Sequence, residues 1–188
     1  MMTAVHSKEP KEFRILSLSG GGYLGLYTAV VLADLEKQVG EPLGRRFDLI
    51  AGTSVGGLLA MALAFEVPMA HIVQLFIERG EEVFSSRRLP GGTVTRLLDM
   101  TRSVLGPKYT GEALRREIAK HFGGRTMGDA QHAVVVPAVD VSRSVTKVFK
   151  TPHTQGSLGD EGLSAVDVTL ATCAAPAISA SRWPWMSA

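Results

Sequence analysis

Residues 50–57 read Ile-Ala-Gly-Thr-Ser-Val-Gly-Gly and decide the fold class of the chain. An apolar run, 47–51, leads into them, and an almost wholly apolar segment, 58–65, follows. This order predicts a strand, a sharp turn and a buried helix, and a Gly-x-Ser-x-Gly turn in that context is typical of a nucleophile elbow. We therefore predict an α/β fold in which Ser54 is the nucleophile.

The residues around Ser54 suit such an elbow, which we assign to Gly52, Thr53, Val55 and Gly56. Glycine on both sides of the serine leaves room where a side chain would crowd the tight turn. The turn also places Ser54 at the first turn of a helix, whose free N–H groups and positive dipole end stabilise a nearby oxyanion. The alternative is that Ser54 merely caps a glycine-rich turn.

A second strand–turn–helix unit precedes the elbow. Residues 13–18 are expected to form its strand. Apolar residues at steps of three and four after the turn predict its helix, which Gly40 ends; they are Leu24, Tyr27, Val31, Leu35 and Val39. The turn between them holds Gly20, Gly21, Gly22 and Gly25. Two strands separated by a helix predict a mostly parallel sheet, in which both turns lie at the same edge. The glycine N–H groups can then form an oxyanion hole beside Ser54.

The same glycines at 20, 22 and 25 also satisfy Gly-x-Gly-x-x-Gly, so a dinucleotide-binding module is the alternative. A dinucleotide site also requires an acidic residue at the end of the second strand. Asp48 lies near the start of that strand, and the serine turn occupies its end. A hydrolase uses both motifs for one task, so we favour the hydrolase.

The rest of the chain continues the α/β pattern. Helices are predicted from 69 to a point between 80 and 84, over 111–122 and over 164–176, and strands over 132–140 and 146–150, the last as a hairpin partner or sheet neighbour. Residues 85–109 fit either a lid or membrane contact or a helix packed on the core.

Composition excludes some classes of protein. The 188 residues carry a net charge of +2 without a basic block interleaved with aromatics, so no nucleic acid polymer is expected as a partner. No cluster of ligands at metal-binding spacing is present, and we predict neither a metal nor a cofactor. The single cysteine, Cys173, favours a reducing cytoplasmic location. Residues 1–12 are polar, which indicates a flexible tail and no signal peptide.

Three motifs, at 19–25, 52–57 and 171–176, together resemble the patatin-like phospholipases over about 13–177. The resemblance implies a three-layer α/β/α fold with a mostly parallel central sheet. It also implies hydrolysis of phospholipid acyl esters by a Ser–Asp dyad, at a membrane surface that the protein binds peripherally. Residues 148–153 and the glycine loop are similar to a bacterial branch of the family that a cyclic dinucleotide activates against phage.

The resemblance also implies a catalytic aspartate in an Asp-Gly-Gly or Asp-Gly-Ala turn after the third motif, and no such turn follows Pro176. We expect that residue beyond Ala188, in a domain over 13–188 that is incomplete at its C-terminus and prone to form homo-oligomers. Asp160 is the candidate base within the chain. Ser54, Asp140 and His153 stand in the order of an α/β-hydrolase triad, which is a weaker alternative.

Two further points bear on activity. Leu24 stands where many family members have arginine in the glycine loop. Without its aspartate the chain would have weak activity or none, because the hydroxyl proton loses its acceptor. An inactive patatin-like protein that acts as a sensor or through protein contacts is therefore also an alternative.

Overall fold

The computed structural model describes residues 12–84, 112–140, 142–153 and 159–174. Its sheet has the order β1-β2-β3-β4. The strands are β1 (Ile15–Leu18), β2 (Leu49–Gly52), β3 (Val134–Asp140) and β4 (Val145–Lys150). The first three are mutually parallel, and β4 pairs antiparallel with β3 as a hairpin. The prediction of a mostly parallel sheet with a terminal hairpin is confirmed.

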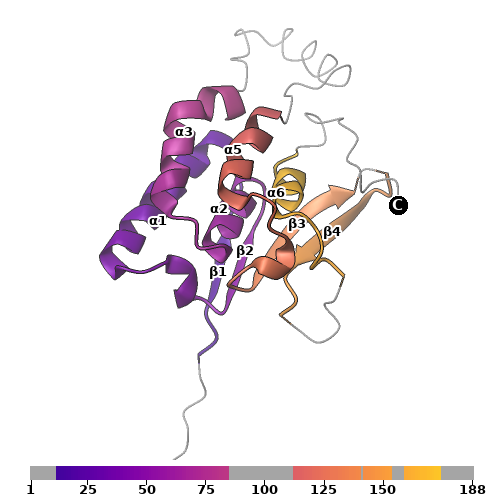
Figure 1. The fold of residues 1–188 in the computed structure, drawn as a ribbon, viewed down its shortest axis with the longest axis horizontal. Coiled ribbons are helices and arrows are strands. Elements are labelled where there is room, and N and C mark those ends of the chain that lie inside the picture. The colour runs from indigo at the N-terminus through magenta and orange to yellow at the C-terminus, as the bar shows by residue number, and fades with distance from the viewer. Residues whose placement is uncertain (1–11, 85–111, 141, 154–158, 175–188) are drawn as a thin grey trace, which may run out of the picture.

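Helices connect these strands where the hydrophobic pattern predicted them (Figure 1). They are α1 (Gly25–Val39), α2 (Val55–Ala64), α3 (Met69–Phe84), α5 (Glu112–Phe122) and α6 (Ala165–Cys173), with short 3-10 turns at Gly22–Leu24, Leu43–Arg46 and Met127–Asp129. Helices α1 and α3 lie side by side. The predicted lid or helix over 85–109 lies outside the described residues.

Helix α2 forms the centre of the core. All ten of its residues are buried, which explains why the sequence after the elbow is apolar on every side. The helix packs on β2 and β3 and contacts α3 and α6 as well. A helix that is hydrophobic all round must be enclosed on all sides, and this one holds the elbow against the sheet.

Helix α1 buries a different face from the one that its apolar periodicity suggests. The buried residues are Gly25, Ala29 and Leu32. Tyr27 and Leu35, which belong to the stripe that predicted the helix, are 77% and 41% exposed. Gly25 and Ala29 face inward where α1 packs against α3 and α2. The periodicity therefore located the helix correctly without identifying its buried side.

The strands bury alternate residues on the face that α2 and α6 cover. Val136 and Phe149 are paired neighbours on this face and are nearly inaccessible. The opposite face carries Ile15, Val139 and Val148, which are 58%, 52% and 43% exposed within the described part of the chain. The described residues therefore contain the sheet and the helical layer on one of its faces.

Candidate active site

Ser54 has the strained backbone of a nucleophile elbow. It is the residue before α2, with φ 56° and ψ −127°, and it is one of three described non-glycine residues with positive φ. Such a conformation costs of order 1–3 kcal/mol and persists only where the surrounding structure holds it. The first helical hydrogen bond runs from the Leu58 N–H to the Ser54 carbonyl, at 3.0 Å. The predicted strand–elbow–helix arrangement is present.

The two glycines of the motif are required by close backbone contacts. A Cβ at Gly52 would lie 2.1 Å from the carbonyl oxygen of Gly56, across the turn. A Cβ at Gly56 would lie 2.2 Å from the carbonyl oxygen of Leu18, at the end of β1. The Thr53 N–H donates to the same Leu18 oxygen at 3.2 Å. The elbow is therefore pressed against the end of the neighbouring strand.

That contact brings the glycine loop to the serine. A Cβ at Gly20 would lie 3.0 Å from Ser54 Cβ and 3.7 Å from Ser54 Oγ. Gly22 has φ 56°, in the left-handed region that favours glycine. Gly25 instead touches the elbow helix, because a Cβ there would lie 2.2 Å from the Val55 side chain. The structure thus brings Gly20 to the nucleophile and uses Gly25 as a packing contact.

Tyr23, in the glycine loop, packs against α3. Its ring meets Phe76 edge-on, with centroids 6.2 Å apart and planes at 67°. The ring also lies directly over Gly80, where a Cβ would be 2.3 Å from it. Leu24 stands where many patatin-like phospholipases, the family that the motifs resemble, have arginine, and its side chain is 78% exposed. Tyr23 therefore anchors the loop, whereas the Leu24 side chain is largely in solvent.

The C-terminal end of α6 lies behind the nucleophile. The Ser54 N–H donates to Thr172 Oγ1 at 2.9 Å, and the Thr172 hydroxyl donates to the Pro137 carbonyl at 2.8 Å. The Cys173 thiol donates to the Ser54 carbonyl at 3.4 Å. Sequence reasoning identified the 171–176 motif only by resemblance and gave Thr172 no role. A buried, hydroxyl-bearing position at the end of an apolar helix was the available signal.

Cys173 is not a second nucleophile. Burial raises the pKa of its thiol to about 12, so the thiol stays protonated at neutral pH although the residue as a whole is partly exposed. The thiolate, not the thiol, is the reactive form.

Asp160 is buried, and its carboxylate already has two partners. It accepts from the Lys147 ammonium at 2.8 Å and from the Lys150 N–H at 3.2 Å. Both lysines belong to β4, two strands from the β2 end that carries Ser54. With neighbouring strands about 4.8 Å apart, that order separates β2 from β4 by roughly 10 Å. The contacts observed for Asp160 are those of an ion pair that closes the edge of the sheet.

We expect Asp160→Asn to reduce stability and to leave the reactivity of Ser54 unchanged. The substitution removes the charge that pairs with Lys147 in a buried setting, which costs about 1–3 kcal/mol of unfolding free energy. Urea unfolding measures that loss, and the rate of labelling by a fluorophosphonate, per folded molecule, measures reactivity. Glu161→Gln, at an exposed neighbouring carboxylate, is the matched control. Slower labelling with unchanged stability would instead identify Asp160 as the base.

The alternative triad is not assembled. The Asp140 side chain, at the end of β3, accepts from the N–H groups of Ser142 and Arg143 at 3.0 and 3.2 Å and so closes the hairpin turn. The hydroxyl of Ser142 leads the interactions that lower the pKa of Asp140. His153 follows β4 and hydrogen-bonds to Thr151. It lies at the amino ends of the parallel strands, whereas Ser54 lies at their carboxyl ends. Asp140 and His153 are therefore at opposite ends of the hairpin.

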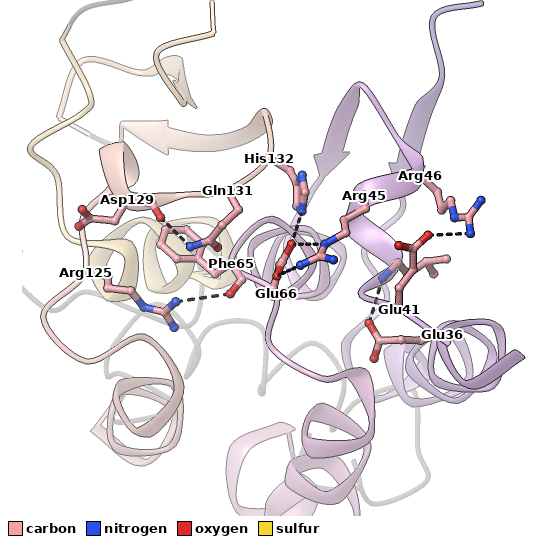
Figure 2. A network of polar contacts seen from close by, with 11 residues as sticks. Glu36, Glu41, Arg45, Arg46, Phe65, Glu66, Arg125, Asp129, Gln131 and His132 are labelled. Carbon is pink, nitrogen blue, oxygen red and sulfur yellow. Dashed lines mark hydrogen bonds and ion pairs between the residues drawn. The ribbon is translucent and has the colours of Figure 1, made fainter. Parts of the chain in front are cut away.

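A second polar cluster lies at the amino ends of β2 and β3 (Figure 2). Arg45 donates twice to the Glu66 carboxylate, at 2.8 and 3.0 Å, and His132 Nε2 lies 3.1 Å from it. The hydrogen bond from Arg45 lowers the pKa of Glu66. Because α2 runs from Ser54 back to this end of the sheet, the cluster lies away from the nucleophile. It ties the end of α2 to the strands.

The described residues lack both a cluster of metal ligands and a membrane-spanning helix. They contain no group of three or more His, Cys, Asp or Glu side chains that could hold a metal ion. They also contain no helix long and apolar enough to cross a membrane.

Comparison with known proteins agrees with this geometry. The family model described as patatin-like phospholipase matches residues 16–184. A cGAMP-activated phospholipase of Pseudomonas aeruginosa is 46% identical over 164 residues, which cover 87% of this chain and 47% of that protein. The cGAMP-activated phospholipase of Escherichia coli is 32% identical, and the match covers 97% of this chain and 51% of that protein. The one of Vibrio cholerae is 34% identical, and the match covers 92% of this chain and 50% of that protein. The chain belongs to the patatin-like phospholipase family.

Membership confirms the resemblance inferred from the three motifs, and with it the three-layer α/β/α fold class. The chain spans about half the length of the relatives it matches. Among solved structures, VipD of Legionella pneumophila is similar at a TM-score of 0.48 and 12% identity, over 90% of this chain and 43% of that one. The type III effector ExoU is similar at a TM-score of 0.44 and 16% identity, over 93% of this chain and 41% of that one.

Proposed function

We propose that this chain carries the nucleophile and the oxyanion site of a serine lipid acyl hydrolase of the phospholipase A type. The observation that carries the proposal is the contact of Gly20 with Ser54, in which a glycine loop with uncovered backbone meets a strained serine at a helix start. Oxyanion stabilisation requires backbone donors in this position relative to the nucleophile. The glycine loop 20–22 and the N–H of Val55, the residue after the nucleophile, are the proposed donors.

In the proposed reaction, Ser54 Oγ attacks the acyl carbon of a phospholipid ester while its proton passes to a base. The bond between that carbon and the glycerol oxygen then breaks, the alcohol leaves with a proton, and an acyl-serine remains. Water cleaves the acyl-serine and releases the fatty acid. The proposed base is an aspartate beyond Ala188, because the Asp160 carboxylate already accepts hydrogen bonds from the Lys147 ammonium and the Lys150 N–H.

The names of the relatives support a finer proposal. Three of them are cGAMP-activated phospholipases. We therefore propose a cyclic dinucleotide as activator of the full-length protein and the phospholipids of a membrane surface as its substrate. A peripheral position at the inner membrane, an anti-phage role and homo-oligomer formation belong to the same proposal. The exposed apolar face around Ile15 and Val148 would favour self-association.

The two alternatives have less support. A dinucleotide-binding module leaves the strained conformation of Ser54 without a use, and Gly25 packs on Val55. An inactive sensor leaves the strained serine, and the exposed glycine backbone beside it, without a use.

The test combines a fluorophosphonate probe with release of fatty acid from phospholipid vesicles, with and without cGAMP. We expect the 188-residue chain to be labelled at Ser54, because labelling requires the elbow and the oxyanion donors. Turnover should be weak, because proton transfer lacks its base, and a chain extended to the length of the relatives should restore it. A folded sample that the probe does not label would contradict the proposal.

A further inference from the structure

The strained backbone of Ser54 is held from one side by a single helix end. Both polar backbone atoms of the serine are bonded to α6, the N–H to Thr172 Oγ1 and the carbonyl to the Cys173 thiol. A conformation that costs free energy must be fixed by its neighbours, and a hydrogen bond to the strained residue itself does so most directly.

Thr172 is in turn oriented by a separate part of the fold. Its hydroxyl donates to the carbonyl of Pro137 in β3, at 2.8 Å. A hydroxyl has one hydrogen, so once that hydrogen points at Pro137 only the oxygen lone pairs can face Ser54. Thr172 is 7% exposed, so water does not compete readily for either bond. The strand thus sets the direction in which Thr172 accepts.

The methyl group of Thr172 also has a fitted neighbour. A Cβ at Gly57 would lie 2.6 Å from Thr172 Cγ2 and 3.0 Å from its Oγ1. The second glycine after the elbow therefore gives Thr172 room beside α2. Three positions far apart in the sequence, Gly57, Pro137 and Thr172, combine to place one oxygen atom against the Ser54 N–H.

We propose that Thr172 is a positioning residue of the hydrolase: it holds the Ser54 backbone in its strained conformation and keeps the Ser54 N–H away from the oxyanion. This inference rests on the proposed function. Because the Ser54 N–H is occupied, the oxyanion donors must be those of the glycine loop and of the residue after the serine. Thr172 does not touch the substrate and acts only through Ser54.

The test compares Thr172→Val with Thr169→Val. Valine keeps the shape of threonine and removes both hydrogen bonds. Thr169 is a matched control on the same helix, fully buried, with its hydroxyl bonded only within the helix, to the Ala165 carbonyl. Thr172→Ser retains the hydroxyl and should rescue the function. The readouts are the rate constant and the half-saturating concentration of fluorophosphonate labelling, the melting temperature, and the hydrogen-exchange protection of the Ser54 amide.

We expect Thr172→Val to lower the labelling rate constant about tenfold to a hundredfold, since a displacement near 1 Å has effects of that size. The half-saturating concentration should change little, the Ser54 amide should lose protection, and Thr172→Ser should stay within about threefold of the parent. Thr169→Val should lower the melting temperature without slowing the labelling.

Equal labelling rates in the two valine variants would overturn the positioning role, as would an unchanged protection of the Ser54 amide. If the folded parent chain is not labelled by the probe, the proposed hydrolase function itself is contradicted. The exchange measurement then shows separately whether Thr172 holds the Ser54 amide.

Discussion

Ser54→Ala is expected to abolish covalent labelling by a fluorophosphonate and, in a chain extended to the length of the relatives, to lower fatty acid release about a thousandfold or more. The substitution removes the one oxygen that can form the acyl-enzyme, while the glycine loop and the elbow stay in place. The mass of the intact protein after labelling measures the adduct, and vesicle hydrolysis measures turnover. Ser17→Ala, at an exposed serine of β1, is the control and should be labelled at the parent rate.

A companion variant separates loss of the nucleophile from loss of the fold. Ser54 has φ 56°, a conformation that glycine adopts more readily than alanine. Ser54→Gly should therefore be at least as stable as Ser54→Ala in urea unfolding, and equally unreactive. A Ser54→Gly protein that is clearly less stable than Ser54→Ala would contradict the strain that we assign to the elbow. Labelling that persists at another serine in either variant would remove Ser54 as the nucleophile.

Most of the architecture could be predicted from local sequence because each signal has a local cause. The elbow requires glycine at 52 and 56, and the parallel order of β1, β2 and β3 follows from the helices between the strands. The hairpin of β3 and β4 is equally local. For these elements the spacing of apolar residues and glycines determines the backbone, and the structure agrees.

The features that sequence could not supply depend on contacts across the fold. Tyr27 and Leu35 mark α1 by their spacing, yet small residues such as Ala29 face the core, because the approach of neighbouring helices decides which side is buried. Asp160 resembles a catalytic loop acid until the lysines of β4 are placed beside it. Thr172 gains its role only when α6 returns to Ser54, 118 positions away in the chain.

Gly56→Ala is a substitution from which we expect a large loss of stability. The new Cβ would lie 2.2 Å from the carbonyl oxygen of Leu18 and 2.7 Å from that of Ser19. Both are backbone atoms at the end of β1, so no side chain can rotate away to relieve the contact. Either β1 or the start of α2 must move, and all ten residues of α2 are buried, which leaves the helix little room to shift. We expect a loss of about 3 kcal/mol in the free energy of unfolding, at the upper end for overpacking.

Gly124→Ala is the matched control, since Gly124 has no heavy atom within 4 Å of an added Cβ. Its stability should be unchanged or raised by up to about 1 kcal/mol, through the lower entropy of the unfolded chain. Urea unfolding at equal protein concentration measures both variants. If Gly56→Ala matched Gly124→Ala in stability, the elbow would have to lie further from β1 than the structure places it. The contact between Gly20 and Ser54 depends on the same approach of β1 to the elbow, so the proposed oxyanion site would then lose its basis as well.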